Sequence, residues 1–130
     1  MSKPVTSKLY CRPVFKVANV EESIKHYREV LGFEQNWIYP FEGEDAKICG
    51  QVSRGEMEII VWVAADIASP GRLYIVLHEE DQLDALHDEI AGKGGKVTKA
   101  PGEQPWAKYG FVVEDIDSNQ LFFCGAGESQ

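Results

Sequence analysis

Apolar positions in the first half of the chain change from the spacing of a strand to that of a helix. Residues 10–19, YCRPVFKVAN, read as a strand that ends at a polar residue. Beyond it, Ile24, Tyr27 and Leu31 are three and four residues apart, which places them on one face of a helix. Gly32 then stands where glycine commonly ends a helix. The pattern predicts a strand followed by an amphipathic helix.

The second half of the chain repeats this order. Residues 72–80, RLYIVLHEE, read as another strand. Leu83, Leu86 and Ile90 then repeat the three-then-four spacing on a helix that ends within Gly92–Gly95. A second strand and helix are therefore predicted.

Further landmarks indicate an internal duplication. Gly32 and Gly94 are 62 residues apart, and the Ala-Lys pairs at Ala46 and Ala107, each opening a strand, are 61 apart. Each half therefore reads as βαβββ, and the predicted fold class is α+β with two such modules. The other strand candidates are Gln35–Tyr39, Met57–Ala64, Lys96–Lys99 and Gln120–Cys124, and the longer loops are Pro40–Asp45 and Pro101–Pro105.

The length and composition are those of one soluble domain. The chain has 130 residues, 44% of them hydrophobic and 26% charged, which is enough for a single core. It has no apolar run near the roughly 18 to 20 residues that cross a bilayer, and no apolar stretch of a secretory signal near its start. We expect one domain over residues 9–125, with modules at about 9–66 and 71–125, after an N-terminal tail of residues 1–8.

Charge and cysteine usage narrow the partners and the compartment. The chain has 13 basic and 21 acidic side chains, a net charge of −8. Such a surface repels phosphate backbones and anionic lipid, so we expect no nucleic acid and no membrane partner. Cys11, Cys49 and Cys124 lie far apart without a C-x-x-C pair, which favours reduced thiols in the cytoplasm over a disulfide framework or a structural zinc site.

Two segments carry a resemblance to a known family. VANVEESIKHYREVLGFE is similar to the strand end, helix and Leu-Gly-Phe stop of the glyoxalase/bleomycin-resistance/dioxygenase (vicinal oxygen chelate) superfamily, and VVEDIDSNQLFF to its closing turn and strand. With Ile116 and Ser118, the turn departs from the family's Asp-Pro-Asp-Gly-Asn. The resemblance implies that the strands of each module curl, with one face on the helices and the other lining a concave cavity.

The resemblance also indicates where a metal would be bound. Metal-using members take about one His or Glu from each of four strands, and these positions correspond here to Arg12, Glu58, Tyr74 and Phe122. Arginine stays protonated and phenylalanine has no donor atom, so this set does not suit a divalent ion. We expect no metal and no cofactor. Arg12 and Glu58 could instead form an ion pair where the ion would lie, with Glu56 as the alternative carboxylate on the same strand face.

The metal-free branch that the chain resembles binds bulky, cationic, partly aromatic antibiotics in grooves of small acidic dimers. The charge of −8 and a wealth of aromatic rings agree with that branch. We therefore expect binding without turnover of a small organic ligand, aromatic and cationic, and a homodimer. The expected ligand-binding residues are Arg12, Trp37, Tyr39, Glu58, Trp62, Tyr74, Trp106, Tyr109 and Phe122, with no catalytic residue.

Two other functions stay open on the sequence. One is a metal-dependent lyase, isomerase or dioxygenase of the same superfamily with displaced ligands. The other is an interaction module whose cavity is plugged by its own side chains. A tightly bound metal in the purified protein would favour the first over metal-free binding. Titration with cationic glycopeptides that gives no quenching of tryptophan fluorescence would favour the second.

Overall fold

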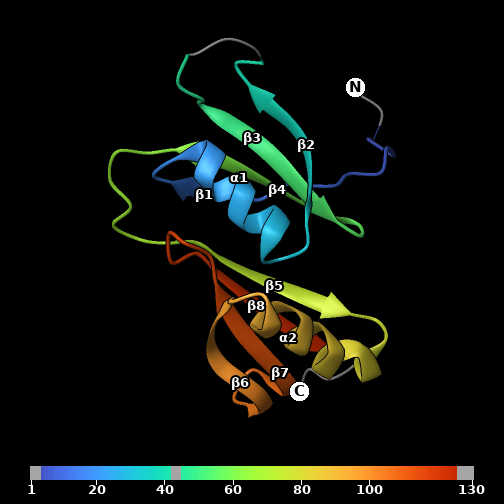
Figure 1. The fold of residues 1–130 in the computed structure, drawn as a ribbon. Helices are drawn as coiled ribbons and strands as arrows, with labels where there is room; N and C mark the ends of the chain where they lie inside the picture. Colours follow the sequence, from blue (N-terminus) through green and yellow to red (C-terminus); the bar gives the residue numbers. More distant parts are fainter. Residues whose placement is uncertain (1–3, 42–44, 126–130) are drawn as a thin grey trace.

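The structure, a computed structural model, describes residues 4–41 and 45–125. It has two modules, one after the other along the chain, each with four strands and one α-helix (Figure 1). The predicted βαβββ order is therefore confirmed in both halves. Of the predicted tail and the Pro40–Asp45 loop, residues 1–3 and 42–44 lie outside the described residues.

Module 1 runs from the first strand to the fourth. Its helix begins after Asn19, whose side chain accepts a hydrogen bond of 2.9 Å from the backbone N–H of Glu22. Ile24 and Tyr27 are buried on this helix together with Val20, as the spacing of the first two predicts. Leu31 is buried as well, but it lies two residues beyond the end of the helix. The elements are β1 (Val14–Val17), α1 (Val20–Glu29), β2 (Glu34–Tyr39), β3 (Cys49–Arg54) and β4 (Met57–Val63).

Module 2 repeats this arrangement. Leu83 and Ile90 are the buried residues of its helix, again as the spacing predicts. Gly94, at a φ of +88°, adopts the left-handed conformation just after the helix. The elements are β5 (Arg72–Leu77), a 3₁₀ turn (Glu80–Gln82), α2 (Leu83–Gly92), β6 (Lys96–Gln104), β7 (Ala107–Glu114) and β8 (Gln120–Gly125).

Each module forms its own sheet. The strand orders are β1-β4-β3-β2 and β5-β8-β7-β6, with β1 parallel to β4 and β5 parallel to β8. Helix α1 packs on β2, β3 and β4, and α2 packs on β6 and β8. In Figure 1 each helix lies in front of its own sheet. One face of each sheet therefore carries a helix, and we call the opposite one the helix-free face.

The core lies on the helix side of both sheets. Ile59 and Val61 of β4 are fully buried, as are Phe111 and Val113 of β7. Residues of both modules belong to one connected apolar cluster. Burial of this cluster is the main force that holds the two modules together.

Polar contacts join the modules at the turn between β7 and β8. The buried carboxylate of Asp115 accepts a hydrogen bond of 2.8 Å from the Tyr27 hydroxyl of α1. Asp117 accepts one of 3.0 Å from the backbone N–H of Ala18, and the Asn119 amide donates to the Lys16 carbonyl. These contacts fix the turn against module 1, so the relative position of the sheets is set by buried polar groups as well as by the core.

The structure corrects three predicted boundaries. The first strand begins at Val14 and not at residue 10, so Arg12 lies ahead of it. The strand expected to open at Ala46 begins at Cys49. Most of the expected loop Pro101–Pro105 belongs to β6, which runs to Gln104 with several register shifts. Because β6 is an edge strand, Pro101 and the irregular pairing are tolerated there. In the described part of the chain, no helix is of the length and apolarity that a membrane span requires.

Candidate functional site

The helix-free face of module 1 carries rings in two rows across the sheet. Strand register places Tyr39, Cys49 and Trp62 side by side on three neighbouring strands. The next row holds Trp37, Gln51 and Ile60. Tyr39 and Trp62 are 49% and 48% exposed, although large aromatic side chains are usually well covered. Three of the expected ligand-binding rings therefore share one open surface.

The helix-free face of module 2 carries a compact ring cluster. Tyr74 and Phe122 are register partners, and their rings stack at 4.7 Å between centroids and 11° between planes. Trp106 meets both edge-on, at 5.8 Å from Tyr74 and 5.2 Å from Phe122. Phe122 is only 7% exposed, whereas Tyr74 is 54% exposed. Phe122 thus forms the floor of the cluster, and Tyr74 presents a face to solvent.

Gly110 makes room for this cluster. A Cβ atom at this position would lie 2.7 Å from Cη2 of Trp106 and 2.4 Å from the carbonyl oxygen of Phe123. Any other residue would therefore push the Trp106 ring off the sheet or strain the backbone of β8. The Trp106 indole N–H is buried and has no acceptor among the described residues.

Tyr109, which is also among the expected ligand-binding residues, does not join these rings. It packs against the core on the helix side of its sheet. Its hydroxyl donates to Asp84 of α2, and this hydrogen bond is the main cause that raises the pKa of Tyr109. In β7 the residues on both faces are apolar, from Phe111 to Val113, so alternation alone could not assign the faces.

The expected pair of Arg12 and Glu58 is wrong as well. No ion pair joins them within the part of the chain that the structure describes. The Arg12 guanidinium instead donates a hydrogen bond of 2.7 Å to the side-chain carbonyl of Gln51 on β3. Gln51, which is 4% exposed, donates in turn to Asn36, and Asn36 donates to Ser53, each over 3.0 Å. Sequence reasoning missed this chain, because a lone glutamine in a strand carries no signal of its partners.

The residues at the positions that the resemblance assigns to a metal do not form a donor set that fits a divalent ion. Glu58 is the only carboxylate among Arg12, Glu58, Tyr74 and Phe122. Phe122 is packed between two rings, so its place is filled by hydrocarbon. In the described ranges, no group of three or more His, Cys, Asp or Glu side chains is arranged to hold a metal.

A cavity of about 660 Å³ lies where the two modules meet. It runs past the edge of β5, and two of the expected site residues, Glu58 and Tyr74, line it. Leu73, Ile75 and Met57 contribute apolar surface. Carboxylates of Glu56 and Glu58 add negative charge from the hairpin of module 1, which favours a cationic group.

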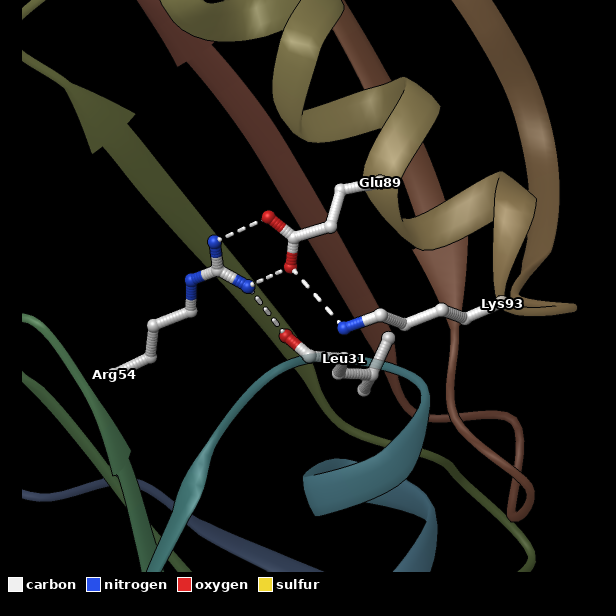
Figure 2. A network of polar contacts seen from close by, with 4 residues as sticks. All are labelled: Leu31, Arg54, Glu89 and Lys93. Carbon is white, nitrogen blue, oxygen red and sulfur yellow. Dashed lines mark hydrogen bonds and ion pairs between the residues drawn. The ribbon is translucent and has the colours of Figure 1, made fainter.

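One wall of this cavity is held by an ion pair between the modules. Figure 2 shows Arg54 of β3 reaching Glu89 of α2. The guanidinium makes two hydrogen bonds to the carboxylate, of 2.6 and 2.9 Å, and a third of 2.8 Å to the Leu31 carbonyl at the end of α1. The hydrogen bond from Arg54 holds the pKa of Glu89 below its usual range. Gly32 lies beside the guanidinium and has a φ of +77°, a conformation that favours glycine.

Comparison with known proteins is consistent with this architecture. The sequence model of the glyoxalase/bleomycin resistance protein/dioxygenase superfamily matches residues 13–123. A search of curated proteins finds no significant match.

Three solved structures illustrate the likeness of fold. A bleomycin-binding protein from Streptomyces verticillus, in complex with copper(II)-bleomycin, has a TM-score of 0.75 at 22% identity, over 94% of this chain and 99% of that one. TioX from Micromonospora sp. ML1 has a TM-score of 0.67 at 12% identity, over 88% and 97%. A superfamily member from Sphaerobacter thermophilus has a TM-score of 0.66 at 22% identity, over 91% and 98%. At these identities the likeness shows the fold alone.

Proposed function

The chain belongs to the glyoxalase/bleomycin resistance protein/dioxygenase superfamily, and on this premise we propose that it binds a bulky, aromatic and positively charged small molecule without metal and without turnover. The observation that carries the proposal is the ring cluster of Tyr74, Trp106 and Phe122. Tyr74 and Phe122 stand at two of the four positions that, by the resemblance, would hold an ion in the superfamily's enzymes, and with Trp106 they present rings there instead. Ring faces stack on planar groups and attract cations at about 0.5–2 kcal/mol each.

The electrostatics of the chain support a cationic ligand. The net charge of −8 attracts cations over long range. Glu58 is half-buried and is without an ion-pair partner in the described residues, so it can receive a positive group. A solved structure of the same fold binds bleomycin, which makes metal-free bleomycin a reasonable first probe.

The proposed binding unit is a homodimer in the cytoplasm. Each sheet is covered by a helix on one face only, and Trp62 and Tyr74 are about half exposed on the open faces. A second copy that brought its module 2 face toward the module 1 face of the first would enclose rings on two sides of a groove. Sedimentation at micromolar concentration should give a dimer, and a monomer would contradict this part of the proposal.

Quenching of tryptophan fluorescence tests the binding. Metal-free bleomycin should quench the protein's emission saturably, and Trp106→Leu should weaken the affinity by about 2- to 30-fold, the equivalent of one ring contact. Tyr109→Phe is the matched control, because its ring lies on the helix side, and its affinity should equal that of the wild type. If bleomycin and other cationic glycopeptides give no quenching at high micromolar concentration, the cavity is plugged and the proposal fails.

A further inference from the structure

The exposed side chain of Arg12 is oriented by a hydrogen bond on the helix-free face of module 1. The residue comes before β1, which is the edge strand of its sheet, yet its guanidinium reaches Gln51 on β3, two strands away. The side chain therefore passes over β4 on the helix-free face. Strand register places Ile60 and Trp37 on either side of Gln51. The guanidinium thus lies next to the ring surface of module 1.

The chain of hydrogen bonds behind Arg12 defines its orientation. Asn36 donates to Ser53 and accepts from the Gln51 amide N–H, so the Gln51 carbonyl must face Arg12. Because Gln51 is almost fully buried, its carbonyl is a firm anchor and not a mobile surface group. A mobile arginine side chain loses conformational entropy when it binds a ligand. Because the hydrogen bond to Gln51 already restricts Arg12 in the folded protein, less entropy is lost on binding, which favours affinity.

Most of the binding capacity of this guanidinium is unused. Arginine has five N–H donors in a planar fork, and Arg12 makes one side-chain hydrogen bond to the described residues. No carboxylate of the described residues pairs with it. Lys16 lies on the same strand face, opposite to the buried Phe15 and Val17, and next to Trp62 in register. A second cation therefore shares this face with Arg12, and the carboxylate of Glu58 on β4 lies on the same face.

We propose that Arg12, oriented by Gln51, binds a carboxylate or a similar planar acceptor carried by the aromatic ligand. The inference rests on the proposed function and adds a chemical demand to it: besides its rings and its positive group, the ligand has an acceptor at the Arg12 end. The guanidinium fork matches a carboxylate with two parallel hydrogen bonds. The repulsion between the acidic surface and a carboxylate is screened beyond about 8 Å at physiological salt. The direct contact with Arg12 should therefore determine whether a carboxylate binds at this position.

Three naphthalene probes of nearly equal shape test the inference: naphthalene-2-carboxylate, naphthalene-2-carboxamide and 2-naphthylmethylammonium. Nitrogen–proton correlation spectra at 150 mM salt would follow the indole N–H signals of Trp37, Trp62 and Trp106 and the Nε–H signal of Arg12. The carboxylate should bind the Trp37 and Trp62 face about tenfold more tightly than the carboxamide, as expected for a charge-assisted pair, and should shift the Arg12 signal.

Two variants of Arg12 and a control variant test whether Arg12 causes the preference for carboxylate. Arg12→Gln should abolish the preference for carboxylate over carboxamide, and Arg12→Lys, which keeps the charge but loses the planar fork, should keep only part of it. Arg28→Gln removes an equal charge from the exposed side of α1 and should leave the preference intact. Unchanged melting temperatures show that the variants are folded.

The outcomes separate this inference from the proposed function. Equal binding of carboxylate and carboxamide to the wild type, or a preference that survives in Arg12→Gln, overturns the role of Arg12 and leaves aromatic binding in place. If no probe shifts any of the three tryptophan signals, aromatic binding itself is refuted.

Discussion

Truncation of the two stacked rings of module 2 should have very different costs. Phe122 is 7% exposed and lies beneath Trp106 and Tyr74, whereas Tyr74 is 54% exposed. A ring of about 200 Å² that is almost fully buried contributes about 5 kcal/mol at 25 cal/mol per Å², an upper bound. Measured truncations of buried Phe cost about 3–5 kcal/mol. Phe122→Ala should therefore lower the free energy of unfolding by about 3 kcal/mol or more.

The same arithmetic gives a smaller value for Tyr74. Less than half of its surface is buried, about 90 Å², which corresponds to at most about 2 kcal/mol. Tyr74→Ala should therefore cost about 1–2 kcal/mol and act mainly on ligand binding. Urea unfolding at 25 °C, followed by far-UV circular dichroism, measures both variants, with equal m values as the check that the denatured states match. Equal costs for the two variants, or a cost below about 1.5 kcal/mol for Phe122→Ala, would refute the assignment of Phe122 as the floor of the cluster.

Three further changes test the joint between the modules. Tyr27→Phe removes one donor to the buried Asp115 carboxylate and should cost about 1–3 kcal/mol in urea unfolding; no loss would show that this hydrogen bond is dispensable. Glu89→Gln keeps the shape but not the charge of the partner of Arg54 and should cost about 0.5–1 kcal/mol, less in 1 M salt, because both side chains are about one-third exposed; a cost independent of salt would contradict this. Burial raises the pKa of Asp117 in the folded protein above its value in the unfolded chain. The folded protein therefore holds this proton more tightly, and its stability should fall as the pH rises from the pKa of the unfolded chain through that of the folded protein. The free energy of unfolding of Asp117→Asn should therefore fall less than that of the wild type between pH 4 and pH 7. A steeper fall in the variant would show that the pKa of Asp117 is not raised on folding.

Much of the fold could be predicted from the sequence because both helices carry a clear three-then-four spacing. Ile24 and Tyr27 are buried as that spacing requires. The 61- and 62-residue repeats located the second module. Periodicity is a strong signal wherever one face of an element is polar and the other apolar.

The site was harder to predict because it depends on contacts across strands. Alternation could not define the face of Tyr109, because the residues on both faces of β7 are apolar from Phe111 to Val113. Arg12 was assigned to a strand because the residues before β1 are rich in strand-forming types, and its partner Gln51 is 39 residues away. Such a contact needs the register of three strands, which the sequence pattern does not define.

In the proposed function, aromatic rings and not a metal hold the ligand, and the ligand is released chemically unchanged. Protein treated with EDTA and gel-filtered should be mixed with a cationic aromatic glycopeptide, and the bound fraction should be recovered and weighed by mass spectrometry. We expect the affinity to be the same after chelation and the ligand to be recovered with its mass unchanged. Loss of binding that added Zn²⁺, Ni²⁺, Mn²⁺ or Fe²⁺ restores, or a ligand recovered with altered mass, would contradict it.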